Sequence, residues 1–218
     1  SVLTKYLIPD HCKLVALGKP TEKESKKWFK RYEKHLPNTG EIVFFDRSWY
    51  TRALVEATMG YCTKRQYTYF MKNVIPWEKK QIEEGVEFFK FYLSIEKNTQ
   101  QKRIDKRATS PLVYWKISEN DLKMLDKWDA FTLYKEQMFK RTSYDEAPWI
   151  VLNANNKKVA ILSALRFILN AFDYPDKDLP KPKIWSEGLN NYKVEINKVL
   201  FENLSYQQYK TLRVFADE

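Results

Sequence analysis

Histidine and cysteine are scarce in this chain, which has two of each among its 218 residues. The two cysteines, Cys12 and Cys62, are far apart and show none of the short spacings that are typical of metal ligands. This composition argues against a zinc site. The shortage of cysteine also favours a reducing, cytoplasmic setting.

Long apolar runs are absent as well. No stretch of the sequence approaches the roughly 20 apolar residues that a membrane-spanning helix needs. The first five residues have neither the charged start nor the apolar centre of a signal peptide. The sequence therefore predicts no membrane segment and no secretory leader.

Glycine occurs only five times, and none of the five belongs to a G-x-x-x-x-G-K-[ST] loop. In that loop, backbone amides and a lysine cradle nucleotide phosphates. The stretch Gly18-Lys19-Pro20-Thr21 lacks the upstream glycine, and its proline removes an amide. The residues that precede it, Val2 to Leu7, have the spacing of the last part of a helix.

Charge of one sign is in clear excess. The chain has 38 basic and 28 acidic residues, which gives a formal net charge of +10. Such an excess predicts an anionic partner, and nucleic acid, a nucleotide, an inorganic polyanion or an acidic membrane would each satisfy it. The hydrophobic fraction of 44% is sufficient for a substantial core. The length fits one large domain, or one domain with an appendage.

Short apolar strands alternate with helical patterns through most of the chain. Strands are expected at 13–17, 42–45, 86–95 and 148–152, and helices at 21–35, 63–85, from Asn98 to a break at 109–111, at 118–141 and at 157–172. Thr21 and Thr63 each begin a capping-box spacing, and Pro76 is expected to kink or split its helix. The alternation favours an α/β fold, with a parallel sheet covered by helices on both faces in three layers.

The pattern stops after Tyr174. Several prolines and charged residues at 175–182 predict a linker, and 185–218 is expected to form a small appended unit. Within it, 194–196 and 199–201 are expected to pair as a hairpin, followed by a short helix at 206–215. The organisation expected is therefore a domain at 1–174 and an extension at 175–218.

The stretch Ile42-Val43-Phe44-Phe45-Asp46-Arg47 is the most informative in the chain. Its four apolar residues predict a strand buried on both faces. Asp46 then lies at the carboxyl end of that strand, where open α/β sheets bind ligands and where a carboxylate can hold a phosphate-bound magnesium ion. Arg47 supplies donors suited to phosphate oxygens. The alternative is an N-cap aspartate beside a surface arginine.

A second informative region runs from Lys97 to Lys116. Its first eleven residues hold five basic side chains and one acidic one, and an aromatic pair follows at Tyr114-Trp115. A basic segment after a strand of an α/β kinase is typical of a lid that closes over phosphates and excludes water. The alternative is a solvated basic helix face.

Four further residues are weaker candidates. Lys13 and Lys19 flank the end of the first strand and are expected to face the same crevice as Asp46. Arg52 is expected to reach back to Asp46 from the following helix, although each of these cations alone fits a surface role better. Asp121 has the spacing of a helix cap with Ser118, and this structural role is at least as well supported as a catalytic one.

These residues together resemble the polyphosphate kinase 2 family. The resemblance extends over about residues 1–173 and is most specific where the Asp46 stretch and the Pro111 stretch combine. The matching stretches are V-A-L-G-K-P-T-E at 15–22, G-E-I-V-F-F-D-R-S-W-Y at 40–50, M-G-Y-C-T at 59–63, P-L-V-Y-W-K-I-S at 111–118 and A-P-W at 147–149.

The resemblance implies a P-loop kinase fold and phosphoryl transfer between inorganic polyphosphate and nucleoside diphosphates such as ADP or GDP. It assigns Asp46 to the Walker-B acid that holds Mg²⁺, with Mn²⁺ as a second possible ion, and Arg47 to the neighbouring arginine. It assigns Arg103 and Arg107 to a lid at about 97–118, and Lys116 to the lysine of the W-K-x-S stretch. Membership also implies a homo-oligomer, a dimer or a tetramer.

Two departures from the family pattern stand out. Members often have W-Y-N-R where this chain has Thr51 before Arg52. The Walker-A loop and a first strand are missing, and we expect both to lie upstream of Ser1, so that the residues as written should bind triphosphates poorly. Two alternatives stay open: another P-loop kinase, such as a nucleoside monophosphate kinase, and a non-catalytic polyanion-binding module. Nucleic acid is a weak candidate partner, because most aromatics have core spacing and no RNA-binding motif is recognised.

Overall fold

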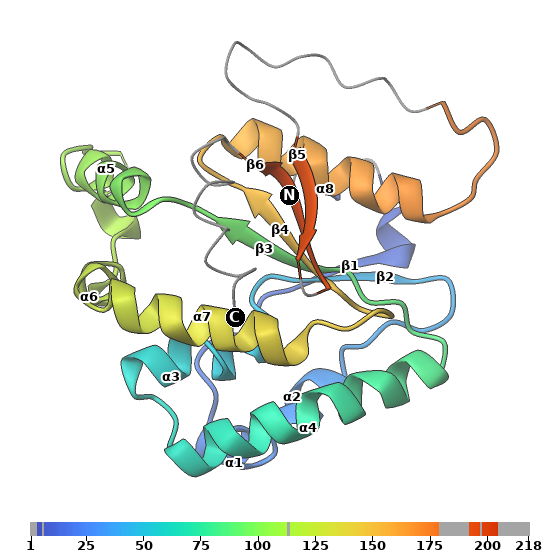
Figure 1. Ribbon diagram of the computed structural model, residues 1–218, viewed down its shortest axis with the longest axis horizontal. Helices are drawn as coiled ribbons and strands as arrows, with labels where there is room; N and C mark the ends of the chain where they lie inside the picture. The colour runs from blue at the N-terminus through green and yellow to red at the C-terminus, as the bar shows by residue number, and fades with distance from the viewer. Residues whose placement is uncertain (1–3, 6, 113, 179–191, 197, 205–218) are drawn as a thin grey trace. The chain divides into compact units, whose positions relative to one another are not determined.

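The computed structural model describes residues 4–5, 7–112, 114–178, 192–196 and 198–204 (Figure 1). These residues divide into two compact units. The first contains the chain up to Glu87 together with Asp129–Met138, and the second contains Phe88–Trp128 and the chain from Phe139 onward. Each unit is described by itself.

The first unit is built around a pair of parallel strands, β1 (Cys12–Val15) and β2 (Ile42–Phe45). Its helices are α1 (Glu22–Lys26), α2 (Trp28–Glu33), α3 (Val55–Met59) and α4 (Lys64–Glu83), with 3-10 turns η1 (Pro9–His11) and η2 (Trp49–Arg52). Capping boxes at Thr21 and Thr63 begin α1 and α4, as their spacing predicts. In each box the threonine hydroxyl and the side chain three residues on satisfy amide donors that the helix leaves open.

Aromatic side chains form the core of the first unit. Trp28, Trp49, Tyr50 and Phe70 are all buried. Trp49 packs edge-on against Phe45, with ring centroids 5.5 Å apart, and so joins the end of β2 to the helices. This packing fixes the chain that leaves β2.

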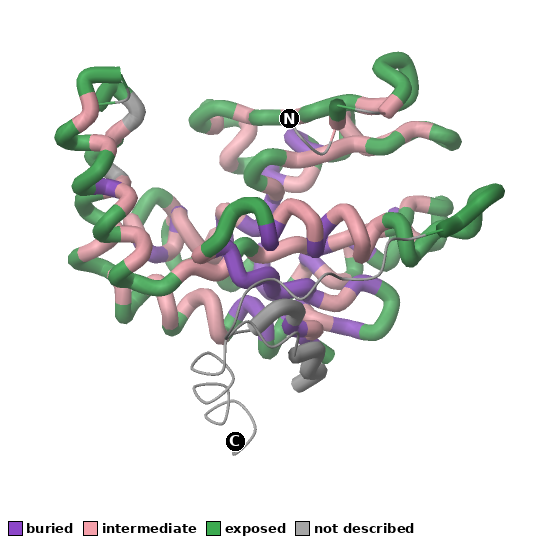
Figure 2. Tube along the Cα trace, turned by 90° about the horizontal axis from the view of Figure 1, so that it is seen from above, coloured by how far each residue is buried: buried purple, intermediate pink, exposed green. Residues whose placement is uncertain are grey.

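The second unit contains a four-stranded sheet in the order β3-β4-β6-β5. Its strands are β3 (Lys90–Ser94), β4 (Trp149–Asn153), β5 (Tyr192–Ile196) and β6 (Val199–Leu204). The pairs β3–β4 and β4–β6 are parallel, and β5–β6 is antiparallel. All five residues of β4 are buried, because a strand lies on each side of it and helices pack on its faces. Figure 2 colours the chain by how far each residue is buried.

Helices cover both faces of β3. Phe91 packs against Phe167 of α8 (Lys157–Ala171), whereas its neighbour Tyr92 packs against Phe139 of α7 (Trp128–Thr142). Successive side chains of a strand point to opposite faces, so α8 and the part of α7 that belongs to this unit, from Phe139 onward, lie on opposite sides of the strand. The remaining elements of this unit are α5 (Lys97–Ala108), η3 (Tyr114–Lys116) and α6 (Glu119–Asp126).

The expected α/β class is confirmed, with several differences in detail. The helix expected at 21–35 is divided at Lys27, and the one expected at 118–141 is divided at Lys127. Pro76 does not divide α4, which is continuous through it. The strand expected to be buried on both faces, β2, is only half-buried, because β1 is its single strand partner among the described residues.

The hairpin expected near 194–201 is present as β5 and β6. It was expected to belong to a separate appended unit, but β6 pairs with β4 and the hairpin extends the sheet of the second unit. The short apolar run of β6 favours this position, because Val199 and Phe201 become buried there. The helix expected at 206–215 lies outside the described residues, as do Val2, Leu3 and Tyr6 of the helix end expected at 2–7.

Candidate active site

Asp46 lies at the carboxyl edge of the strand pair in the first unit. Its backbone N–H donates to the carbonyl of Val15 at 2.9 Å, which continues the parallel ladder by one bond and places Asp46 beside the end of β1. Its side chain is exposed and makes no hydrogen bond or ion pair with a described residue. A carboxylate on a backbone held by the strand ladder is therefore available to a ligand at this edge.

The backbone at Arg47 has a φ of 67°, in the left-handed region that non-glycine residues seldom adopt. Such a conformation costs roughly 1–2 kcal/mol and persists only where the surroundings hold it. Here the next residues supply the restraint: Tyr32 donates its hydroxyl to the carbonyl of Ser48 at 3.3 Å, and Trp28 donates its indole N–H to the carbonyl of Trp49 at 2.9 Å. The backbone thus leaves the regular path of β2 at Arg47, whose side chain is exposed.

Trp49 is itself held in place by a hydrogen bond to helix α4. Its indole N–H donates to Glu78 Oε1 at 2.9 Å, and the Glu78 side chain is fully buried in α4. A buried carboxylate needs donors to offset the loss of its hydration. The pair therefore ties the Asp46 turn to a long helix, which makes Trp49 and Glu78 positioning residues that the sequence reasoning missed. A glutamate among the apolar positions of a helical pattern was the available signal.

The predicted role of Arg52 near Asp46 requires correction. The Arg52 side chain is 1% exposed, with Nε 3.0 Å from Glu56 Oε2, Nη2 bonded to Ser25, and the guanidinium centre 3.9 Å from the ring centroid of Trp28. Burial raises the pKa of the Glu56 carboxyl, and the neighbouring Arg52 and Arg31 guanidinium groups oppose that rise. A guanidinium enclosed in this way has no surface to offer a phosphate, so its role is structural.

Lys13 does not face the Asp46 edge either. It lies within β1 opposite Val43, and its ammonium donates to both carboxylate oxygens of Glu41 at 2.8 and 2.9 Å. Glu41 precedes β2, so the ion pair lies toward the amino end of the strands. The hydrogen bond from Lys13 lowers the pKa of the Glu41 carboxyl. Lys19, in contrast, follows β1 in an exposed loop and lies beyond its carboxyl end, as expected.

In the second unit, the loops at the carboxyl ends of β3 and β4 are bonded to each other. The Ala154 N–H donates to the carbonyl of Ser94 at 2.7 Å, and Asn155 Oδ1 accepts from the N–H of Glu96 at 3.0 Å. Arg103 of α5 completes the connection, because its Nη2 donates to the carbonyls of Ala154 and Asn155 at 2.7 and 3.0 Å. Arg103 and Asn155 thus fix the basic helix at the carboxyl edge of the sheet.

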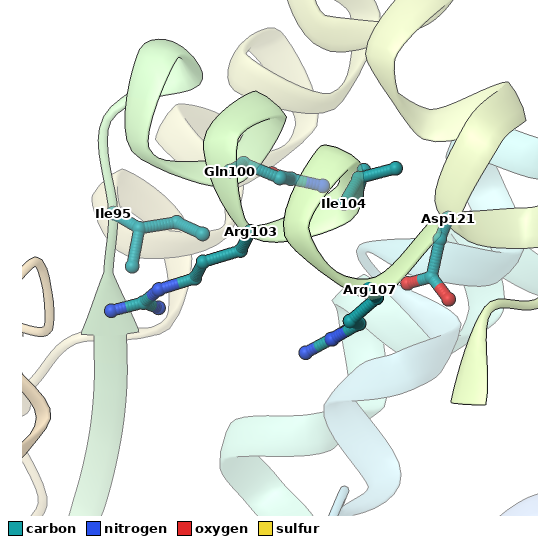
Figure 3. A pocket seen from close by; sticks show the side chains of 6 residues that line it. All are labelled: Ile95, Gln100, Arg103, Ile104, Arg107 and Asp121. Carbon is teal, nitrogen blue, oxygen red and sulfur yellow. The ribbon is translucent and has the colours of Figure 1, made fainter. Parts of the chain in front are cut away.

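A cavity of about 160 Å³ opens beside α5 (Figure 3). It is lined by Ile95, Gln100, Arg103, Ile104, Arg107 and Asp121. Arg103 and Arg107 are one helical turn apart and extend toward the same side. The Arg107 guanidinium has no hydrogen-bond or ion-pair partner among the described residues, so its donors are open to a ligand in this cavity.

The helix-cap role predicted for Asp121 is confirmed, whereas its catalytic role stays a prediction. Its Oδ2 accepts from the N–H and the hydroxyl of Ser118, each at 2.9 Å, and closes the capping box of α6. It also lines the cavity. Lys116 ends η3, and its side chain is outside the part of the chain that the structure describes.

Asp46 is the acid on which a metal site would depend. Among the described residues, no three His, Cys, Asp or Glu side chains gather in a way that could enclose a metal ion. Magnesium does not require such a cage, since it usually keeps several waters and binds one or two carboxylates together with substrate phosphates. An exposed, unpaired carboxylate at a strand end fits that mode. Also within the described residues, no helix has the length and apolarity that crossing a membrane requires.

Comparison with known families gives one match across most of the chain. The family described as Polyphosphate kinase 2 (PPK2) matches residues 1–180.

Individual proteins agree with that match. The chain is 44% identical over 175 residues to a GDP-polyphosphate phosphotransferase of Mycolicibacterium smegmatis, covering 80% of the chain and 62% of the relative. It is 40% identical over 183 residues to an ADP-polyphosphate phosphotransferase of Pseudomonas aeruginosa, covering 84% of the chain and 60% of the relative. The chain thus spans about three-fifths of the length of these relatives.

Solved structures agree as well. The crystal structure of a polyphosphate kinase 2 from Arthrobacter aurescens TC1 superposes with a TM-score of 0.71 at 29% sequence identity, covering 80% of this chain and 64% of that one. A likeness of this extent, together with the sequence identity, shows a shared fold.

Proposed function

Because the chain belongs to the polyphosphate kinase 2 family, we propose that the protein transfers a phosphoryl group between inorganic polyphosphate and nucleoside diphosphates, ADP or GDP, in a reversible reaction. The relatives named for GDP and for ADP support this substrate class. The observation that carries the proposal is the unpaired Asp46 carboxylate followed by the strained Arg47 turn, both held by buried tryptophans. Phosphoryl transfer depends on such fixed charges more than on covalent chemistry by the protein.

Asp46 is the proposed metal acid. Mg²⁺, or Mn²⁺ in its place, would be held by this carboxylate together with substrate phosphates, and would supply charge neutralisation between the donor and acceptor phosphates. The carboxylate is suited to this task because it has no partner among the described residues to lose when a ligand arrives.

The arginines divide into two groups by what already binds them. Arg103 donates to two backbone carbonyls, so we assign it mainly to the position of α5. In the part of the chain that the structure describes, Arg47 and Arg107 have no such partners, and both can place a planar fork of donors against phosphoryl oxygens as negative charge redistributes in the transition state. Lys19 and Lys116 are proposed to hold phosphates further from the reacting centre.

We also propose a cytoplasmic homo-oligomer. The cytoplasmic assignment is supported by Cys12 and Cys62, which are both free thiols. The oligomer is supported by family membership, and light scattering of the purified protein tests it.

The deciding experiment measures triphosphate formation in the full-length protein from polyphosphate, magnesium and ADP or GDP, with no ATP present. Asp46→Asn should lower kcat at least about a hundredfold, because the metal loses its fixed carboxylate. Its stability should change by less than about 0.5 kcal/mol, since the side chain is exposed and unpaired. Arg107→Ala should lower kcat by about 10³-fold, as loss of a transition-state arginine does elsewhere.

The assay also separates the alternatives. A nucleoside monophosphate kinase would need ATP as donor and would form no product from polyphosphate. A binding module would retain salt-sensitive polyphosphate binding without turnover. Near-normal activity in Asp46→Asn would show that the metal acid has been misassigned.

A further inference from the structure

A stripe of lysines runs along α1 and α2 of the first unit. Lys23 lies in α1, Lys27 at the break between the two helices, Lys30 in α2 and Lys34 at its C-cap, and all four are exposed. With Glu24 and Arg31 they line a shallow depression of about 160 Å³. We call these four residues the lysine stripe.

The two nearby acids, Glu24 and Glu33, are hydrogen-bonded to groups outside the lysine stripe. Glu24 accepts from the N–H and hydroxyl of Thr21 in the capping box, at 2.9 and 3.2 Å. Glu33 accepts the indole N–H of Trp77 at 2.8 Å. None of the four lysines forms an ion pair with a described residue. Like charges at a spacing of four residues repel, so the stripe carries a standing cost that a bound polyanion would remove.

Helix α2, which contains Lys30 and ends at the C-cap Lys34, is firmly held. Its opposite side buries Trp28 and Tyr32, and Phe29 stacks on Phe70 and Trp77 of α4 with ring centroids 5.6 and 5.0 Å apart. The lysines are therefore displayed on a rigid platform. Binding there would order only the lysine side chains and not the backbone.

The stripe is also joined to the Asp46 edge. Arg31 is buried beneath the stripe and donates to the carbonyl of Gly18, the residue before Lys19. The loop that contains Lys19 begins where β1 ends, and β1 ends beside Asp46. The lysine stripe is thus linked, through Arg31, to the loop that leaves the Asp46 edge.

We propose that the lysine stripe binds the distal part of an inorganic polyphosphate chain whose end reacts near Asp46. The proposal rests on the proposed phosphotransferase function and adds to it a second subsite that only long chains reach. Polyphosphate has the required chemistry, because it is a flexible polyanion with a charge on every phosphate and no base that needs stacking. The stripe offers cations without an aromatic side chain that would select a nucleic acid.

The test compares long-chain polyphosphate with tripolyphosphate. In a variant with Lys23, Lys27, Lys30 and Lys34 changed to Gln, KM for long-chain polyphosphate should rise on the order of tenfold, whereas kcat and KM for tripolyphosphate should stay unchanged. The affinity for labelled long-chain polyphosphate, measured without nucleotide, should depend less steeply on salt concentration in this variant. The slope of log K against log salt should fall by about 3, because each neutralised phosphate of a single-stranded polyanion contributes about 0.7.

The matched control removes the same charge elsewhere in the first unit, by changing the exposed α4 lysines Lys64, Lys72, Lys79 and Lys80 to Gln. This control should leave both KM values and the salt slope near those of the parent protein. An equal loss in the control would reduce the effect to net charge and overturn the proposal, as would an unchanged KM for long chains in the stripe variant.

Two other results would also reject it. A parallel rise of KM for tripolyphosphate would place the lysines at the reacting end, and RNA that competes as strongly as polyphosphate through the same lysines would identify a nucleic-acid site. Failure of the underlying function is recognised separately, because the parent protein would then form no triphosphate from either donor.

Discussion

Arg52 offers a direct test of the structural role that burial assigns to it. Arg52→Met should destabilise the first unit without weakening substrate binding. The substitution keeps much of the apolar stem but removes the cation that lies 3.0 Å from Glu56 Oε2 and 3.9 Å from the ring centroid of Trp28. It also removes the guanidinium N–H group that donates a hydrogen bond to the Ser25 hydroxyl.

The expected loss is about 3–5 kcal/mol in the free energy of unfolding. Removing one partner of a buried ion pair typically costs this much, since the other charge is left without compensation. Replacing both partners by apolar residues is often neutral. Arg52→Met combined with Glu56→Leu should therefore be more stable than Arg52→Met alone.

The loss should depend on pH. Burial raises the pKa of the Glu56 carboxyl, and Arg52 opposes that rise, so its removal should raise the pKa further. A carboxyl whose pKa is higher in the folded state is penalised while it is ionised, and the penalty disappears as pH falls through the folded pKa. The destabilisation by Arg52→Met should therefore be largest at neutral pH and shrink toward the ordinary pKa of glutamate.

Denaturant unfolding followed by tryptophan fluorescence measures these differences, with exposed Lys26→Met as a control that should change stability by less than about 0.5 kcal/mol. Steady-state kinetics on the same variants supply the second readout. The reasoning is refuted if Arg52→Met keeps its stability and raises KM for polyphosphate or the nucleotide, because Arg52 would then contact substrate.

Two further predictions concern the elements around the candidate site. Trp49→Phe should cost about 2–4 kcal/mol in unfolding free energy, because it leaves the buried Glu78 carboxylate without the indole donor and opens a small void. It should also lower kcat, because the Asp46 turn loses this restraint; an unchanged kcat would show that the Trp49–Glu78 hydrogen bond does not position that turn. Lys13→Met should leave kcat and the KM values for polyphosphate and nucleotide unchanged, because the Lys13 ammonium is held by Glu41 toward the amino end of the strands. A raised KM for polyphosphate in this variant would show that Lys13 contacts the substrate.

The helices and strands, and the α/β class of the fold, could be predicted from local sequence patterns. Capping boxes at Thr21, Thr63 and Ser118 begin α1, α4 and α6, and apolar runs mark β2 and β4, because these signals act within a few residues of each other. The position of Asp46 after a strand followed from the same local pattern. The break at Lys127 did not, since nothing in the periodicity of Leu122 and Leu125 marks it.

The surroundings of individual side chains could be determined only from the tertiary structure. Arg47, Arg52 and Arg107 are the same type of residue, and the sequence does not distinguish their surroundings. In the structure, Arg47 is exposed on a strained turn, Arg52 is buried against Glu56 and Trp28, and Arg107 lines a cavity. A long cation can pair, stack or remain solvated, and which of these occurs depends on partners that are distant in the chain.

Strand neighbours were undetermined for the same reason. The β-branched and aromatic residues of β6 predict a strand, but its place beside β4 is set by the long-range contact that buries Val199 and Phe201. The sequence by itself therefore determined the elements, the family and the acid at the strand end, because these depend on local patterns and on residues in fixed order. Only the tertiary structure decided which cations remain available to phosphate, because availability depends on what each side chain meets after the chain has folded.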